Sequence, residues 1–249
     1  MVDIHAHILP GIDDGAKDLD HALEMADLAV ESGVTILVTT PHCNQYRNPA
    51  NLWDNELIKH FRDFQAELKK ADIPLTIVPG MEIYGTEDTP LYLRDKQMIG
   101  LNGSNYPLIE FPFRNYGGQA TDILEEVVAL GMVPIVAHPE RYLYVQDEPG
   151  ILNLWAEMGC LFQVNKGSLL GRFGRQEQRL GMELIRRNFA FAVASDAHTP
   201  TARSTWMADV EELISEEFSP DMAKRLLETN PLRILKNEKI HRVEPYWFR

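Results

Sequence analysis

Residues 3–7 read Asp3-Ile4-His5-Ala6-His7 and place two imidazoles two positions apart at the end of an apolar run. On a strand, such side chains point to the same face, so both imidazoles can reach one metal ion. Six further apolar runs end on polar residues in the same way: Thr40-Pro41-His42, Gly80-Met81-Glu82, Ile109-Glu110, Ala137-His138-Pro139-Glu140-Arg141, Val164-Asn165 and Ser195-Asp196-Ala197-His198. Histidines and carboxylates collected in this way suit a multinuclear site for divalent metals. The pattern predicts a metal-dependent hydrolase.

Strands and helices are expected to alternate along the chain. Apolar, β-branched runs predict seven strands, at 2–5, 35–40, 75–79, 106–111, 133–137, 161–165 and 190–195. Apolar residues at helical spacing predict helices at 20–32, 52–71, 120–130, 151–158, 178–188, 206–217 and 220–228, and Asn230-Pro231 is expected to end the last one. This alternation is typical of βαβ units with parallel strands, and therefore of an α/β protein.

The positions of the polar residues favour a closed barrel. In an α/β barrel the chemistry gathers on the loops at the C-terminal ends of the strands, and each polar segment above lies at such an end. Seven strands, where the regular barrel has eight, predict a distorted (β/α)7 barrel that forms a single domain over residues 1–249. An open doubly wound sheet is the alternative, but it would have difficulty bringing ligands from so many strands to one point.

Composition and charge exclude several classes of protein. The 249 residues are 45% hydrophobic and 24% charged, which allows a full core, and the net charge is −13. A chain this acidic is not expected to bind a nucleic-acid backbone or an anionic membrane surface. No apolar run approaches the ~18 residues of a membrane span. A cleaved signal peptide would remove the first two histidines, so we expect a cytoplasmic protein.

The ordered motifs resemble the PHP (polymerase and histidinol phosphatase) superfamily. They most closely resemble its capsule and exopolysaccharide branch of bacterial manganese-dependent tyrosine phosphatases. The segments that carry the resemblance are Met1-Val2-Asp3-Ile4-His5-Ala6-His7-Ile8, Asp13-Asp14-Gly15, Glu82-Ile83-Tyr84, Leu108-Ile109-Glu110-Phe111, Ala137-His138-Pro139-Glu140-Arg141-Tyr142 and Ala194-Ser195-Asp196-Ala197-His198. The similarity extends from Met1 to about Leu235, and six ordered blocks are far more specific than one HxH pair.

The resemblance implies a distorted seven-stranded barrel, the PHP fold, with three divalent metal ions. His5, His7 and Asp196 would hold the first ion, and Glu82 would bridge it to the second, which Glu110 and His138 complete. Asp14, His42 and His198 would hold the third. The role of Asp14 rests on the resemblance alone, and Asp13 is a plausible rival. Manganese is favoured by the resemblance, while histidine and carboxylate ligands also fit iron or zinc.

The same resemblance implies a substrate. Arg141 and Arg203 match positions that bind the substrate phosphate, although Arg141 could instead pair with Glu140. The substrate would be phosphotyrosine, chiefly on the tyrosine-rich tail of a bacterial tyrosine autokinase that controls polysaccharide export. Two metals held about 3.5–4 Å apart would supply a hydroxide and neutralise the phosphoryl oxygens. Residues 167–179 align only loosely with the branch, which leaves their contacts with a peptide open.

Other functions remain alternatives. A small-molecule phosphomonoesterase of the histidinol-phosphatase type would use the same metals in a closed pocket. A polymerase-associated exonuclease would need a basic groove, against which the net charge of −13 argues. A non-catalytic, metal-stabilised protein that binds the kinase tail is a third alternative. Asn165 is expected to hydrogen-bond a metal ligand, and Tyr246-Trp247-Phe248 to serve in packing or at an interface.

Overall fold

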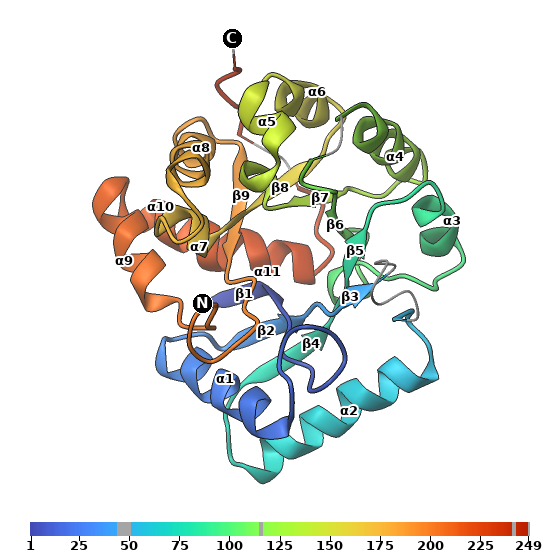
Figure 1. Cartoon of the computed structure of the whole chain (residues 1–249), viewed down its shortest axis with the longest axis vertical. Helices are drawn as coiled ribbons and strands as arrows, with labels where there is room; N and C mark the ends of the chain where they lie inside the picture. Colours follow the sequence, from blue (N-terminus) through green and yellow to red (C-terminus); the bar gives the residue numbers. More distant parts are fainter. Residues whose placement is uncertain (44–50, 115–116, 241–242, 249) are drawn as a thin grey trace.

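Parallel strands form the centre of the molecule and helices surround them (Figure 1). The computed structural model describes residues 1–43, 51–114, 117–240 and 243–248. The strands are β1 Val2–Ala6, β2 Ile36–Thr39, β3 His42–Cys43, β4 Thr76–Pro79, β5 Glu82–Tyr84, β6 Leu108–Glu110, β7 Ile135–Ala137, β8 Leu161–Asn165 and β9 Ala190–Ala194. They form a sheet in the order β1-β2-β4 and a second in the order β3-β5-β6-β7-β8-β9. The predicted α/β class is confirmed.

The nine strand segments correspond to the seven strands expected from the sequence. The short pieces β3 and β5 continue β2 and β4 after a break of two residues each, Thr40-Pro41 and Gly80-Met81. Proline has no N–H to give to a ladder, so Pro41 interrupts the first of these strands. At Gly80 a Cβ atom would lie 2.7 Å from Cγ1 of Val38, so the second break needs a glycine. The continuation of both strands across these breaks was not foreseen.

Backbone hydrogen bonds close the ring between its first and last strands. The N–H of Asp196 donates to the carbonyl of His5 at 2.8 Å, and the N–H of His7 donates to the carbonyl of Ala197 at 2.8 Å. A parallel bridge joins Ala6 to Ala197. These bonds link β1 to the end of β9, so the structure is a distorted barrel and the open doubly wound sheet is wrong.

Helices cover the outside of the barrel. They are α1 Leu19–Glu31, α2 Asn55–Lys70, α3 Thr89–Arg94, α4 Gly117–Ala129, α5 Leu143–Asp147, α6 Ile151–Glu157, α7 Lys166–Leu169, α8 Arg175–Arg186, α9 Ala208–Glu217, α10 Pro220–Lys224 and α11 Asn230–Leu235, with short turns η1 Leu101–Gly103, η2 Pro139–Arg141 and η3 Arg225–Thr229. Asp54 caps α2 by accepting hydrogen bonds from the N–H groups of Glu56 and Leu57. Within the described residues, no helix has the length and apolarity that crossing a membrane requires.

Two apolar clusters hold the fold together. The larger lies between strands and helices, as the buried stripe of α2 shows with Phe61 and Phe64. The smaller gathers buried side chains from β1, β2, β6, β7, β8 and β9, together with Ile234 from α11. Since these strands are neighbours in the ring, the smaller cluster fills the barrel, and α11 contributes the side chain that packs into it. The interior is thus a solid support for the polar strand ends above it.

The predicted helix end at Asn230-Pro231 is wrong. The chain widens into a π-helical turn at η3 and continues directly as α11, with Thr229 and Asn230 in helical conformation. Pro231 lies in the first turn of α11, where its missing N–H costs little because the π turn has already shifted the hydrogen-bond register. Nδ2 of Asn230 also donates to the carbonyl of Phe191, which fixes this segment against β9.

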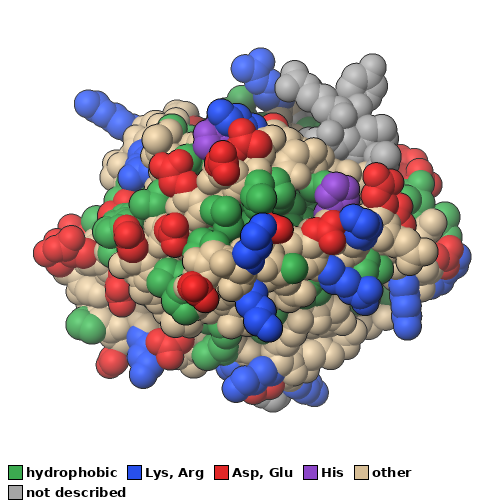
Figure 2. Space-filling model, turned by 90° about the horizontal axis from the view of Figure 1, so that it is seen from below, with side chains coloured by type: hydrophobic (Ala, Val, Ile, Leu, Met, Phe, Trp, Pro, Cys, Tyr) green, Lys and Arg blue, Asp and Glu red, His purple; other side chains and the backbone are tan. Residues whose placement is uncertain are grey.

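The C-terminal aromatic residues pack against the body of the protein. The ring of Phe248 lies 5.1 Å from that of Phe189, just before β9, and Nδ2 of Asn153 donates to the carbonyl of Phe248 at 2.9 Å. Tyr246 is largely exposed. On the face drawn in Figure 2, basic and acidic side chains are interspersed.

Candidate metal centre

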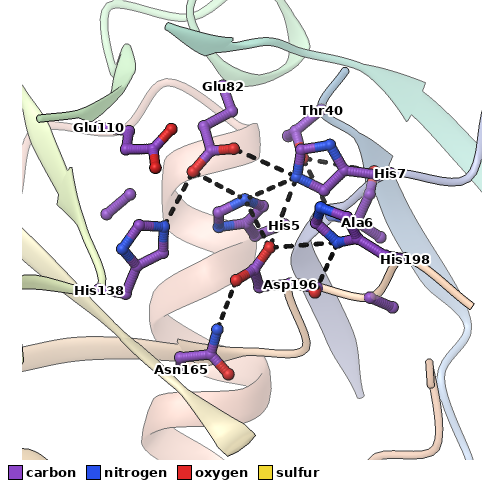
Figure 3. Close-up of polar contacts among 12 residues, drawn as sticks. His5, Ala6, His7, Thr40, Glu82, Glu110, His138, Asn165, Asp196 and His198 are labelled. Atoms are coloured by element: carbon purple, nitrogen blue, oxygen red, sulfur yellow. Dashed lines mark hydrogen bonds and ion pairs between the residues drawn. The ribbon is translucent and has the colours of Figure 1, made fainter. Parts of the chain in front are cut away.

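The predicted ligands lie at the C-terminal ends of the strands, in the loops that follow them, or at the start of the continuing pieces β3 and β5, which begin with His42 and Glu82. Figure 3 shows His5, His7, Glu82, Glu110, His138, Asp196 and His198 gathered in one place. β1 and its following loop supply His5, His7 and Asp14, and the segment after β9 supplies Asp196 and His198. Their ligand atoms form four overlapping groups, each within 4.8 Å: His7, Asp14, His42 and His198; His5, His7 and Asp196; His5, Glu82 and His138; and His42, Glu82 and Glu110. Side chains from distant parts of the sequence therefore converge on one place.

These groups differ in one respect from the ligand sets implied by the resemblance. Glu82 lies in two groups, which suits a bridging carboxylate. His138 and Glu110, expected to share one metal ion, fall in different groups. Nε2 of His138 lies 2.9 Å from Oε1 of Glu82, whereas Oε2 of Glu110 lies 3.7 Å from Nδ1 of His42. The assignment of particular ligands to particular ions thus remains a prediction.

The hydrogen bonds of His5 and His7 determine which ring nitrogens face the centre. Nδ1 of His5 lies 2.9 Å from Oε1 of Gln163, and Nδ1 of His7 lies 2.7 Å from Oδ2 of Asp13. Both partners are acceptors, so each Nδ1 carries the proton and each Nε2 presents a lone pair. The two Nε2 atoms are 3.2 Å apart. Two facing lone pairs repel unless a cation lies between them, so this donor pair fits a metal ion.

The buried charges around Glu82 support the same conclusion. Its Oε1 lies 3.2 Å from Nε2 of His5, and its Oε2 lies 3.2 Å from Nε2 of His7 and 2.9 Å from Nδ1 of His42. Burial by itself would raise the pKa of Glu82, but the charges of His5 and His42 outweigh it and hold that pKa well below its usual range. The carboxylate is therefore ionised and available as a ligand.

Burial and neighbouring charges also shift the pKa values of Asp196, His7 and His138. Burial opposes the ionisation of Asp196, yet His5 and its other cationic neighbours keep the pKa of Asp196 well below the usual range. Burial would lower the pKa of His7, but Asp13 overcomes it and raises that pKa well above its usual value, so a bound metal ion would displace a proton from Nε2. Burial, with the charge of Arg141 adding to it, lowers the pKa of His138 to about 4, so this imidazole is neutral and can act as a ligand.

Two of the candidate ligands have a strained backbone. His138 has φ 33° and ψ 54°, and Asp196 has φ 49°. The left-handed region is unfavourable for residues with a Cβ atom, at a cost on the order of 1–3 kcal/mol each. His138 directly follows β7 and Asp196 lies two residues after the end of β9, and each turns its side chain toward the other ligands (Figure 3). Strain of this kind is typical of functional sites, where the surrounding structure holds it.

The structure separates the roles of Asp13 and Asp14. Asp14 is mostly exposed, and its Oδ1 lies 3.4 Å from Nε2 of His42 and 3.5 Å from Nε2 of His198. A hydrogen bond with His198 is the largest cause that lowers the pKa of Asp14. Asp13 is turned away from this group and supports His7 from behind. The contacts of Asp14 thus favour it over Asp13 as a candidate ligand, and Asp13 contacts a candidate ligand, His7.

Asp196 also receives the two predicted phosphate-binding arginines. Its Oδ2 accepts from Nη1 of Arg141 at 3.1 Å and is 2.6 Å from Nη2 of Arg203. Nδ2 of Asn165 donates to the same oxygen at 2.6 Å, so Asn165 contacts a candidate ligand as expected. Arg141 forms its ion pair with Asp196 rather than with Glu140, which accepts from Ser168 Oγ at 2.7 Å. Both guanidinium groups thus lie at the outer side of the centre.

Sequence reasoning missed several residues that shape this site. Gln163 lies in β8 two positions before Asn165, so its side chain points to the same face, and that spacing was the available signal. Asp13 was considered only as a rival ligand. Phe113 and Phe173, whose rings lie against Arg141, carried no signal in the sequence pattern.

Comparisons with known proteins identify the family of the chain. A family model described as capsular polysaccharide synthesis, CpsB/CapC, matches residues 1–236. The tyrosine-protein phosphatase YwqE of Bacillus subtilis is 35% identical over 248 residues, or 98% of this chain and 95% of that protein. The tyrosine-protein phosphatase CpsB of Streptococcus agalactiae is 31% identical over 247 residues, or 96% of this chain and 100% of that protein. A solved structure from work on YwqE of Bacillus subtilis and CpsB of Streptococcus pneumoniae, described as unique metal-dependent tyrosine phosphatases, superimposes with a TM-score of 0.93 and 33% identity over 100% of both chains.

Proposed function

The chain belongs to the CpsB/CapC family of capsular polysaccharide synthesis, and from this premise we propose that its metal centre hydrolyses phosphotyrosine in proteins. It is a metal-dependent tyrosine phosphatase of capsule synthesis. One observation in the structure carries the proposal. Oδ1 of Asp196 faces Nε2 of His5 and of His7 at 3.5 Å each, while its Oδ2 binds two arginines. A cation site and an anion site thus share one carboxylate.

We propose nine metal ligands and three metal ions. Nitrogen and oxygen donors without a thiolate fit Mn²⁺, with Fe²⁺ and Zn²⁺ as further candidates. When bound, such ions supply a nucleophilic hydroxide near neutral pH and neutralise the oxygens of a phosphoryl group. The ligands are His5, His7, Asp14, His42, Glu82, Glu110, His138, Asp196 and His198.

Arg141 and Arg203 would bind the phosphoryl oxygens that face the mouth of the site. A guanidinium fork matches two oxygens of a phosphate, and each arginine is already anchored through Asp196. Nε of Arg203 is buried and has no hydrogen-bond partner in the described part of the chain, so it remains a donor for the substrate. Tyrosinate leaves more readily than an alkoxide because the pKa of the phenol is about 10. The chain can therefore release it without a strong general acid.

The substrate protein would be a tyrosine kinase of the same capsule system, dephosphorylated on its tyrosine-rich tail. A side-by-side assay tests this function on a phosphotyrosine peptide and on histidinol phosphate. The protein is stripped with chelator and then given Mn²⁺, and His138→Ala serves as the control. We expect metal-restored release of phosphate from the peptide, and its loss in His138→Ala. A preference for histidinol phosphate would keep the metal centre and refute the protein substrate, and release from neither compound would favour a non-catalytic binding role.

A further inference from the structure

Two phenyl rings lie against the guanidinium group of Arg141. Its Cζ atom lies 4.7 Å from the ring centroid of Phe113 and 4.4 Å from that of Phe173. Phe113 comes from the loop after β6 and Phe173 from the loop after α7. The ring of Phe113 also lies 5.9 Å from the imidazole of His138, so this pair of rings borders the metal centre. A guanidinium in contact with two aromatic rings is attracted to both.

The loop that carries Phe173 is shaped to place this ring. In this loop Gly171, with φ 73°, and Gly174, with φ 135°, lie on either side of Arg172 and Phe173, and both adopt conformations that residues with a Cβ atom rarely adopt. At Gly167 a Cβ atom would lie 2.7 Å from Cε2 of Phe173, so the ring needs a glycine beneath it. Three glycines thus serve the placement of one phenyl ring.

Arg172 fastens this loop to the segment that carries Arg203. Its Nη1 donates to the carbonyl of Ala202 at 3.2 Å, and its Nη2 donates to Oδ2 of Asp209 at 3.0 Å. Phe173 therefore also lies near Arg203, whose Cζ is 5.9 Å from the ring centroid. One ring contacts both arginines.

The two arginines need such support because their charges repel. Both bind the same oxygen, Oδ2 of Asp196, and one carboxylate oxygen offsets only part of two positive charges. An aromatic face attracts cations, so the ring of Phe173 adds a second attractive partner for both arginines. Resting on the function proposed above, we propose that Phe173, together with Phe113, is a positioning residue that holds Arg141 and Arg203 as a preformed binding pair for the substrate phosphate.

Phosphate binding to the metal-loaded protein tests this role without any need for turnover. Phe173→Leu keeps an apolar side chain but removes the ring face, and Phe173→Tyr keeps the face. We expect Phe173→Leu to raise the Kd of inorganic phosphate, measured by calorimetry, by about 3- to 30-fold, and Phe173→Tyr to change it less than about twofold. The KM for a phosphotyrosine peptide should rise by a similar factor with kcat little changed, as expected when ground-state and transition-state binding are lost equally.

The chain offers a matched control in Phe248→Leu. The ring of Phe248 lies 4.8 Å from Cζ of Arg187, but at the end of the barrel away from the metal centre, beside the residues that precede β9. This variant should leave the Kd of phosphate unchanged. Phe113→Leu removes the other face from Arg141 and should weaken phosphate binding by a similar factor, which provides a second test if Phe173→Leu does not fold.

Three results would overturn the role of Phe173. They are an unchanged phosphate Kd in both Phe173→Leu and Phe113→Leu, an equal loss in Phe173→Tyr, or a loss that follows a fall in bound metal. Failure of the proposed function would look different, because the wild-type protein would then bind phosphate without hydrolysing the phosphotyrosine peptide. In that case the effect of Phe173→Leu on phosphate binding would still support the positioning role.

Discussion

Asp13→Asn offers a sharp test of how the metal centre is held. Three N–H groups converge on the buried carboxylate of Asp13. They belong to Nδ1 of His7 at 2.7 Å, the backbone of His42 at 2.9 Å and the backbone of Gly15 at 2.9 Å. Asparagine has nearly the same shape but only one acceptor oxygen, so its NH₂ group must face at least one of these donors. The change therefore opposes either the N–H of Gly15 or the two N–H groups of His7 and His42, depending on how the amide turns, without altering the packing.

The size of the effect follows from these contacts. A hydrogen bond to a charged partner contributes about 1.5–3 kcal/mol, and the bond that orients His7 is among those at risk. Loss of a carboxylate behind a ligating histidine typically weakens metal binding by about 10- to 100-fold. Both figures agree, because each tenfold change in affinity corresponds to about 1.4 kcal/mol. We expect Asp13→Asn to raise the Kd for Mn²⁺ by about 10- to 100-fold.

Competition with a fluorescent chelator would measure this Kd, and turnover of a phosphotyrosine peptide across a Mn²⁺ titration would show whether excess metal restores activity. Asp54→Asn is the matched control, since Asp54 accepts two backbone N–H groups at the start of α2, where asparagine caps equally well. It should leave the Kd for Mn²⁺ unchanged. A Kd for Mn²⁺ in Asp13→Asn within twofold of wild type would refute the argument that Asp13 orients His7.

Further predictions concern single groups. Glu82→Gln removes the ionised carboxylate that contacts four histidines, so the affinity for Mn²⁺ should fall by more than roughly 100-fold. Mass spectrometry of the bound metal would measure this loss. Arg203→Lys loses the bidentate fork, so the KM for a phosphotyrosine peptide should rise about 10-fold while metal content stays constant. Burial lowers the pKa of Lys166 to about 8, so the unfolded chain binds more protons than the native protein between that value and its ordinary pKa of 10.5. Wild type should therefore gain up to roughly 3 kcal/mol in free energy of unfolding, relative to Lys166→Met, as pH rises through this window. Urea titrations at several pH values would measure it, and the same pH dependence of the unfolding free energy in both proteins would contradict the prediction.

The strands of the fold could be predicted from the sequence where the pattern of apolar residues indicates which segments are buried. Parallel strands buried on both faces appear as apolar runs, and seven such runs led to the seven strands of the ring. The sequence did not predict that two strands resume after the breaks at Pro41 and Gly80, because the resumed pieces β3 and β5 pair through only two or three residues each. Asn230-Pro231 misled for a different reason. Local sequence disfavours a helix before proline, whereas the packing of Ile234 into the barrel interior favours continuing it.

The candidate centre was predictable to the extent that strand ends converge. Once the strands form a ring, a histidine or carboxylate that follows a strand is carried to the same mouth, whatever its distance along the chain. That argument places His5, His42 and His198 together without any knowledge of side-chain geometry. It does not reveal which groups support them, because hydrogen-bond partners such as Gln163 and Asp13 depend on rotamers and on the curvature of the ring.

Asp196 shows why the geometry adds chemistry that the motif lacks. Its left-handed backbone, with φ 49°, directs one carboxylate oxygen to the imidazoles of His5 and His7 and the other to Arg141 and Arg203. A metal ion held by His5, His7 and Asp196 would draw electron density from the carboxylate and weaken its hold on the arginines. The guanidinium groups then turn more readily to a phosphate, while the rings around Arg141 keep them in place. Metal binding and phosphate binding are thereby coupled through one side chain, so loading with Mn²⁺ should tighten phosphate binding beyond the direct attraction between the two ions.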